Sequence, residues 1–175
     1  MIFIPTKING AFTIEIEKKS DDRGFFGRTY DVNEFDKHNI NSKIVQCNIN
    51  FTKKKGTLKG LHYQIKPFEE SKLIRCTRGS VYSVLVDLRP NSPTYKQWES
   101  TILSQNEYNW RHIPEGCANG IQTLDDDTEI IYQVSQYYSQ EHEGGIRWND
   151  PTFNIDWPLP VESISKKDDS WPDFM

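Results

Sequence analysis

The sequence predicts one all-β domain, a sandwich or barrel that spans residues 1–175. Short apolar stretches recur at a spacing of roughly ten residues, and clusters of Gly, Pro, Asn and Asp separate them, which is typical of this fold class. Aromatic residues make up 13% of the chain within a total apolar content of 35%, so they supply much of its apolar surface. Aromatic side chains favour strands and can form a pocket that stacks flat ligands.

The N-terminal segment is expected to combine a strand with one short helix. Residues 2–18 alternate in part and predict a strand with one face toward solvent, followed by a turn at residues 21–24. A short helix is predicted over residues 31–38, because Asp31 is a favourable N-cap and Glu34 follows three residues later.

A polar strand face is predicted over residues 44–51, where Gln46, Asn48 and Asn50 share one side. Three amides in a row are costly to bury without hydrogen-bond partners. These side chains are therefore expected either to be exposed to solvent or to line a polar pocket.

The later strands continue the pattern toward a packed tail. Residues 81–88 are largely apolar and predict a central strand, and residues 120–124 and 129–134 are expected to form a hairpin across three aspartates. Trp157 and Trp171 in the C-terminal tail predict that it packs onto the domain. Other strands are predicted at residues 72–76, 96–103 and 110–113.

Composition and charge argue against several classes of partner. The net charge is −4 without a basic excess, so duplex nucleic acid is not an expected partner. The lysine run at residues 53–55 is expected at a solvated loop tip. No apolar run approaches the roughly 18 residues of a membrane span, and we expect a soluble, cytoplasmic protein. Cys47, Cys76 and Cys117 are widely spaced and are expected to be reduced structural thiols.

The stretch of residues 56–64 is the clearest candidate for chemistry. Alternation turns Leu61 and Tyr63 to one face and His62 to the other, beside small and polar neighbours. His62 is therefore either a base that faces a pocket or a core histidine whose ring nitrogens are satisfied by hydrogen bonds.

Two motifs around this stretch resemble those of the cupin jelly roll. Five residues separate Gly56 from His62, and two residues separate the end of residues 113–116 from Asn119. Cupins commonly hold a metal with two histidines and a carboxylate in the first motif and one histidine in the second. Here Gln64 and Asn119 occupy two of those positions. One imidazole and two amides do not supply a usual transition-metal site, so the sequence predicts no metal.

From Asp22 to Asp168 the chain resembles a narrower family, the metal-free nucleotide-sugar 3,5-epimerases. The type member of that family acts on dTDP-4-dehydro-6-deoxyglucose. The resemblance implies a cupin jelly-roll barrel with one or two short helices and a packed tail. Each matching run is weak alone, but their shared order makes the resemblance specific. The runs are residues 22–26, 45–48, 58–64, 72–73, 86–89, 92–94, 113–116, 137–139, 148–151 and 157–158.

The resemblance implies acid–base catalysis without a cofactor. A 4-keto sugar is acidic at C3 and C5, and inversion needs a base, an acid on the opposite face and a group that holds the enolate oxygen. The matching positions are His62 for the base, Asp168 for the carboxylate that orients its imidazole, Tyr132 for the acid and Lys72 for the cation at the C4 oxygen. Pattern alone leaves a solvated tail charge, a core tyrosine and an exposed strand lysine open as alternatives for the last three.

The resemblance also implies a binding surface and a homodimer. A region from Arg23 to Phe26 is expected to reach into the neighbouring subunit's site, in a dimer built by exchanged N-terminal strands. The expected partner is a nucleotide-activated 4-keto sugar. The positions that match contacts to its nucleotide, pyrophosphate and sugar are Arg23, Gln46, Asn48, Lys59, Tyr138, Glu143 and Lys167.

Three departures from the family pattern fall on ligand-binding positions. Arg28 stands where the dTDP-sugar enzymes usually carry a glutamate, Lys59 replaces an arginine, and Asn119 replaces a histidine. Lysine still neutralises phosphate, but it lacks the bidentate fork of arginine. We therefore expect the same reaction on another carrier or sugar: a GDP-linked 4-keto heptose for a surface polysaccharide, with a dTDP-linked 4-keto-6-deoxy hexose as the alternative. Whether C3, C5 or both are inverted stays open.

Other classes remain as alternatives. A nucleotide-sugar ketoisomerase on the same fold would usually carry a histidine pair, which Gln64 and Asn119 argue against. A non-catalytic sugar-binding cupin would not need the four catalytic positions together. A metal dioxygenase is disfavoured by the missing metal ligands.

Overall fold

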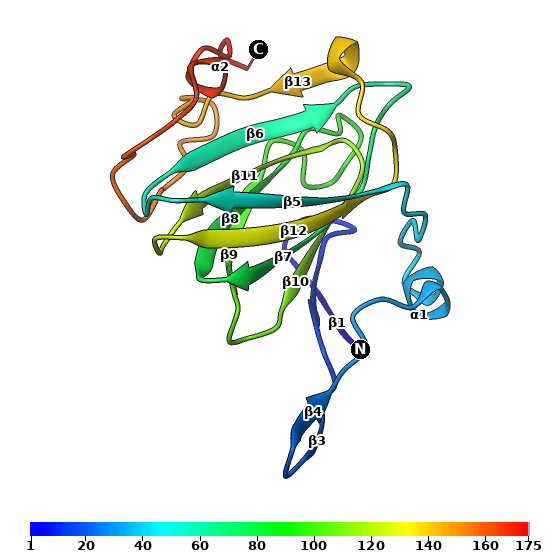
Figure 1. Cartoon of the computed structure of the whole chain (residues 1–175). Coiled ribbons are helices and arrows are strands. Elements are labelled where there is room, and N and C mark those ends of the chain that lie inside the picture. Colours follow the sequence, from blue (N-terminus) through cyan, green and yellow to red (C-terminus); the bar gives the residue numbers. More distant parts are fainter. Residues whose placement is uncertain (175) are drawn as a thin grey trace.

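The chain folds into two antiparallel sheets that face each other, which confirms the predicted all-β jelly roll (Figure 1). The computed structural model describes residues 1–174. The six-stranded sheet has the order β1 (Ile2–Pro5), β2 (Phe12–Glu15), β10 (Trp110–Ile113), β7 (Lys72–Arg78), β12 (Thr128–Val134), β5 (Gln46–Thr52). The five-stranded sheet has the order β13 (Glu143–Gly145), β6 (Leu58–Gln64), β11 (Cys117–Thr123), β8 (Ser80–Asp87), β9 (Trp98–Ser104).

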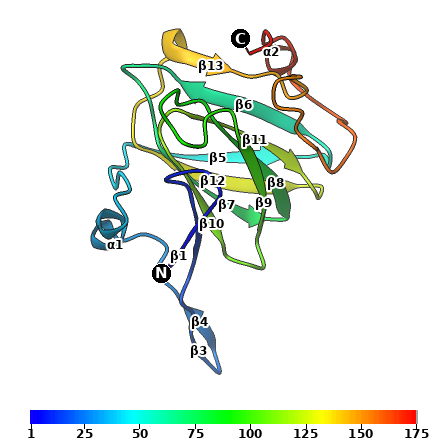
Figure 2. The same ribbon diagram turned by 180° about the vertical axis from the view of Figure 1, so that it is seen from behind.

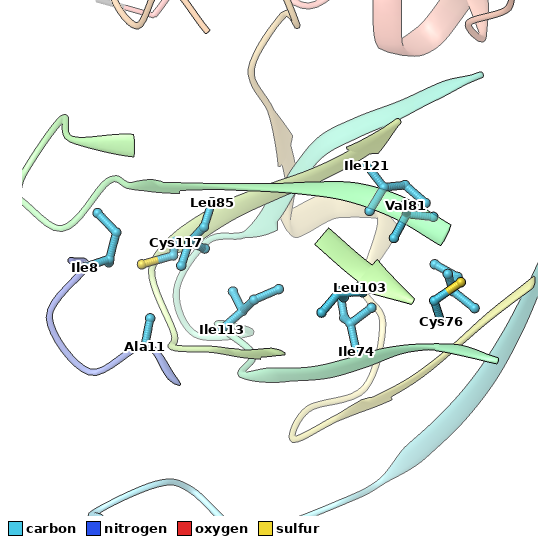
Figure 3. Packing of buried hydrophobic residues seen from close by; sticks show 11 residues of the cluster. Ile8, Ala11, Ile74, Cys76, Val81, Leu85, Leu103, Ile113, Cys117 and Ile121 are labelled. Carbon is cyan, nitrogen blue, oxygen red and sulfur yellow. The ribbon is translucent and has the colours of Figure 1, made fainter. Parts of the chain in front are cut away.

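The main hydrophobic core lies between the two sheets (Figure 3). Ile74 and Ile113 from the six-stranded sheet meet Val81, Leu85 and Leu103 from the other, and all five are buried. Strand β8 is central to this packing, as its apolar run predicted, because β11 and β9 flank it on its two edges. Because side chains alternate along each strand, those that do not point into this core face either the solvent or another cavity.

Two cysteines belong to the same core. Cys47, Cys76 and Cys117 are all free, and the last two are buried. Burial raises the pKa of the Cys76 thiol to about 11 and that of the Cys117 thiol to about 12. Cys76 and Cys117 therefore pack as core residues, in line with the structural role expected from the sequence.

The short helices and the tail follow the sequence closely. Helix α1 (Val32–Lys37) begins after Asp31, whose carboxylate accepts a hydrogen bond from the Asn33 amide at 3.0 Å, as the N-cap prediction requires. The tail carries α2 (Lys166–Asp169) and packs onto the second sheet, where the Leu58 amide donates to the Ser163 carbonyl. The N-terminus lies near α1 and the base of the β3–β4 hairpin, whereas α2 lies beside β13 at the far side of the two sheets (Figures 1 and 2).

Two sequence predictions about strand pairing are wrong. Residues 2–18 form two strands, β1 and β2, that pair with each other across the buried Ile8 and Ala11. Strands β11 and β12 do not form a hairpin, since β11 pairs with β6 and β8 whereas β12 pairs with β5 and β7. The aspartate turn therefore carries the chain from one sheet to the other. Local alternation cannot distinguish these connections, because both hairpin and crossover join two alternating strands.

The remaining elements are short. Strands β3 (Lys19–Asp21) and β4 (Gly24–Phe26) form a hairpin that projects away from the two main sheets (Figures 1 and 2). A 3-10 turn, η1 (Gln140–His142), precedes β13. Within residues 1–174, each helix is too short or too polar to cross a membrane.

Strand β6 contains a β-bulge at Gly60. Asn119 lies opposite His62, but Ile121 lies opposite Lys59, so β6 has one extra residue between these pairs. The bulge turns Lys59 and His62, three residues apart, toward the same cavity. Gly60 has a φ of 99°, and a Cβ at this position would lie 2.7 Å from the Asn119 carbonyl oxygen. Glycine is therefore required here by both backbone conformation and space.

We predict that Gly60→Ala lowers the free energy of unfolding by about 3 kcal/mol, since it combines a strained φ with a backbone clash. Urea unfolding followed by circular dichroism would measure the loss. The matched control is Gly24→Ala in the projecting hairpin, which also has a positive φ but no heavy atom within 4 Å of the added Cβ. Equal losses in the two variants would contradict the role of the close approach.

Candidate active site

The site is a pair of adjoining cavities between the two sheets. The larger has a volume of about 530 Å³ and lies among β5, β6, β7, β11, β12 and the segment that leads into α2. The smaller has a volume of about 360 Å³ and lies nearer β13. His62, Lys72 and Tyr132 line both cavities. The two spaces therefore meet at the three side chains that the sequence assigned to proton transfer and enolate stabilisation.

His62 and Asp168 form a direct pair. The His62 Nε2 lies 2.6 Å from the Asp168 Oδ1, and the Gly60 amide donates to the other carboxylate oxygen at 3.3 Å. Burial would raise the pKa of Asp168, but these hydrogen bonds outweigh it and hold the pKa below its usual value. An ionised Asp168 can only accept a hydrogen bond, so the proton of a neutral His62 imidazole lies on Nε2. The lone pair of that imidazole is then on Nδ1. The arrangement prepares His62 to take a proton.

Tyr132 stands on the opposite sheet from His62. It lies on β12 between β5 and β7, packs against the main core and lines both cavities. Burial, and secondarily the Glu70 carboxylate, raise the pKa of Tyr132, so its phenol is protonated at neutral pH. A base on one wall and a phenolic donor on the other suit proton removal and return on opposite faces of a ligand.

Lys72 is not an exposed strand lysine. Its ammonium lies 3.0 Å from a Glu70 carboxylate oxygen, and the two side chains are only 12% and 10% exposed. Sequence analysis missed Glu70, although its spacing of two residues from Lys72 placed it on the same side of an extended chain. The pairing holds the Lys72 ammonium at the cavities that Tyr132 also lines.

Lys59 and Asn50 meet in the larger cavity. The Lys59 ammonium donates to the Asn50 side-chain oxygen at 2.5 Å, and Asn119 lines the same space. Burial lowers the pKa of Lys59, while the charge of Asp168 opposes this shift. Asn50 was not among the expected ligand residues, although it shares its strand face with Gln46. That alternation was the signal that could have identified it.

The smaller cavity holds a second hydrogen-bonded cluster. The Tyr138 hydroxyl donates to Glu143 at 2.7 Å, and the Lys167 ammonium contacts the same carboxylate oxygen. Burial would raise the pKa of Glu143, but these two partners lower it. The Gln46 side chain accepts a hydrogen bond from the Tyr138 amide at 2.9 Å, and Asn48 lines the cavity beside it. The amide face predicted for β5 therefore lines a pocket.

Gln64, at the position of a cupin metal ligand, has a structural role. It is buried, and its side chain donates to the carbonyls of Phe68 and Tyr137 and accepts from the Ser139 amide. These bonds hold two loops together at the end of β6. Among residues 1–174, His, Cys, Asp and Glu side chains nowhere gather in a group of three or more that could hold a metal ion.

Three expected ligand residues lie away from the cavities in the single chain. Arg23 sits at the tip of the β3–β4 hairpin, where its side chain is 85% exposed and pairs with Asp21 (Figure 1). Phe26 is 65% exposed on the same hairpin. Arg28 pairs with Asp31 at the start of α1.

Comparison with known proteins identifies the family. A family model described as dTDP-4-dehydrorhamnose 3,5-epimerase matches residues 5–175. The chain belongs to this family. An enzyme of the same name from Sinorhizobium fredii is 40% identical over 173 residues, which cover 98% of this chain and 89% of that protein. The resemblance inferred from the ordered motifs is confirmed.

Solved structures of the family superpose closely on the fold. The dTDP-4-dehydrorhamnose 3,5-epimerase of Bacillus anthracis, with TDP and PPi bound, gives a TM-score of 0.94 at 37% identity and covers 99% of each chain. The enzyme of Legionella pneumophila, in complex with dTDP-4-keto-L-rhamnose, gives 0.87 at 36% identity and covers 95% of this chain and 89% of its own.

We predict that Asp168→Asn destabilises the protein in a pH-dependent way. Because the folded pKa of Asp168 is lowered, its ionised form stabilises the fold fully above the ordinary aspartate pKa of about 3.9. The contribution is lost as the pH falls through the folded pKa. The unfolding free energies of wild type and variant should differ by about 1–2 kcal/mol at neutral pH and converge in acid.

Urea unfolding at a series of pH values would measure this difference. Asp22→Asn, an equivalent change at an exposed hairpin residue, is the control and should show little loss at any pH. A loss in Asp168→Asn that is the same at neutral and acid pH would contradict the prediction.

Proposed function

We propose that this protein epimerises a nucleotide-linked 4-keto-6-deoxy sugar at C3, C5 or both, by acid–base catalysis through an enolate. The observation that carries the proposal is the placement of the His62–Asp168 pair and Tyr132 on opposite sheets around one cavity, with Lys72 beside them. The family of the chain supports the same reaction class.

The geometry gives each group a step. The C4 carbonyl acidifies the protons on C3 and C5, and the free Nδ1 of His62 removes one of them. Asp168 stabilises the resulting imidazolium. The Lys72 ammonium stabilises the negative charge that moves to the C4 oxygen. Tyr132 then returns a proton from the other face, which inverts the carbon. Positioned acid–base groups of this kind typically contribute about 10²–10⁴-fold in rate.

The remaining cavity residues would hold the carrier. Lys59 and Lys167 offer positive charge to a pyrophosphate, and Tyr138, which is 58% exposed, offers a surface for stacking. In a homodimer with exchanged N-terminal strands, Arg23 and Phe26 would complete the partner's site. Their exposure at the end of a projecting hairpin supports this arrangement.

Solved relatives and two cavity residues bear on the carrier and the sugar. Relatives solved with TDP or a dTDP-linked keto sugar favour dTDP and a 4-keto-6-deoxy hexose. Of the three departures that suggested GDP and a heptose for a surface polysaccharide, Lys59 and Asn119 line the larger cavity, whereas Arg28 does not. The GDP-linked heptose stays a second candidate because of those two residues.

Solvent-proton exchange tests the reaction. In deuterated water, wild type should incorporate deuterium at C3, C5 or both of dTDP-4-dehydro-6-deoxyglucose, followed by mass spectrometry and NMR. His62→Asn should lower exchange at least about 10²-fold, since it removes the base. Tyr132→Phe should lose inversion of the sugar carbon more than it loses deuterium exchange. Proton removal by His62 comes before the step that needs the phenol.

The exposed His38 provides a control, and His38→Asn should exchange as wild type does. Full exchange in His62→Asn would sink the proposed mechanism. Absence of exchange in wild type would favour a non-catalytic sugar-binding protein, and movement of the carbonyl from C4 to C3 would favour a ketoisomerase.

Thermal-shift titration with dTDP, GDP and UDP tests the carrier. A ligand present at 100 times its Kd stabilises the folded state by about 2.7 kcal/mol, so the preferred nucleotide should raise the melting temperature most at equal concentration. We expect dTDP to give the largest shift. A larger shift with GDP would instead select the GDP-linked substrate, and Lys59→Arg with Asn119→His should then weaken that preference.

A further inference from the structure

The Glu70–Lys72 pair places a carboxylate inside the proposed catalytic cavity. Glu70 precedes β7 and lines the smaller cavity together with His62 and Tyr132. Its side chain is 10% exposed, and its Oε1 lies 3.0 Å from the Lys72 ammonium. The reaction outlined above uses Lys72 but assigns nothing to Glu70.

A carboxylate in this position requires a physical reason. A buried charge is costly unless it is paired, and removal of one partner leaves the other uncompensated. A lone carboxylate would also repel the pyrophosphate of a sugar nucleotide. Pairing with Lys72 removes both problems, and it takes only part of the donor capacity of the ammonium, which has three N–H groups. The remaining donors can point into the cavity.

We propose that Glu70 is a positioning residue, whose carboxylate holds the Lys72 ammonium against the cavity that His62 and Tyr132 line. The inference rests on the proposed function, because it concerns the placement of the group that stabilises the enolate oxygen. The ammonium of a lysine sits on a flexible stem of four carbons, so its position is poorly fixed unless a partner holds it. Glu70 supplies that anchor from the segment just before the same strand.

The charge of Glu70 has a second consequence for Tyr132. After burial, Glu70 is the other cause that raises the pKa of Tyr132, so its carboxylate favours the protonated phenol. Several other ionisable groups line the two cavities that Tyr132 lines. They are Lys59, His62 and Tyr63 from β6, Lys72 from β7, Tyr138 from the loop after β12, Glu143 from β13 and Asp168 from α2.

Two substitutions separate the anchor from the charge. Glu70→Ala removes both, and we expect kcat to fall about tenfold with KM changed less than about threefold, since a displaced catalytic group lowers kcat. Glu70→Gln keeps an oxygen that can accept from Lys72, and it should restore kcat to within about threefold of wild type. The substrate is dTDP-4-dehydro-6-deoxyglucose, with epimer formation followed by NMR.

An ultraviolet titration of tyrosinate, which needs no substrate, tests the charge. The Tyr132 signal is obtained by subtracting the titration of the same protein carrying Tyr132→Phe. In Glu70→Gln the Tyr132 midpoint should lie below that of wild type, because the carboxylate charge that disfavours tyrosinate is gone. Glu69→Gln is the matched control, because it removes the same charge from the adjacent residue, which lines a different cavity with Arg89 and Gly116.

The results separate the role of Glu70 from the proposed epimerase activity. The role of Glu70 would be overturned if Glu70→Gln did not restore the kcat that Glu70→Ala loses. It would also be overturned if the Tyr132 midpoint were the same in Glu70→Gln, Glu69→Gln and wild type. Failure of wild type to turn over the sugar nucleotide would overturn the proposed function, while the tyrosinate titration would still decide whether Glu70 acts on Tyr132. Circular dichroism and unfolding midpoints establish that each variant is folded.

Discussion

The site depends on the close approach of Gly60 to the backbone of β11. Because no Cβ stands between the strands, β6 can bulge beside Asn119. The bulge directs Lys59 into the cavity on the same side as His62, and it aims the Gly60 amide at Asp168. A regular strand would have turned Lys59 to the opposite face. One residue without a side chain therefore brings together the proposed base, its carboxylate and the ammonium proposed to bind phosphate.

Charge pairing governs the rest of the cavity. His62 meets Asp168, Lys72 meets Glu70 and Lys167 meets Glu143, so each of these carboxylates has a cationic or imidazole partner. Lys59 differs, since its hydrogen-bond partner is the neutral amide of Asn50. The cavities thus contain paired charges together with one ammonium, that of Lys59, whose direct partner carries no charge. Burial lowers the pKa of Lys59, and a pyrophosphate would reverse that cost by supplying the missing negative charge.

Sequence reasoning succeeded where the information is local or where motifs occur in order. Alternation placed Gln46 and Asn48 on one face of β5, which lines a pocket in the structure, and the N-cap of α1 followed from Asp31 with Glu34 three residues later. It failed where the outcome depends on a distant partner. The chain after β11 crosses to the other sheet because both edges of β11 are already paired, which no local pattern records. Asp168 could be recognised only by resemblance, since its contact with His62 spans 106 residues.

The exposed apolar surface connects the site to the expected dimer. Ile2 and Ile4 are 47% and 40% exposed on β1, and Phe26 is 65% exposed on the hairpin that projects from the two main sheets. Large apolar side chains gathered near one end of a molecule usually mark a surface that another molecule covers. The same hairpin carries Arg23, which has no role in the cavity of its own chain. A dimer that buried this surface would remove the apolar exposure and deliver a guanidinium to a neighbouring site, so a single arrangement accounts for both features.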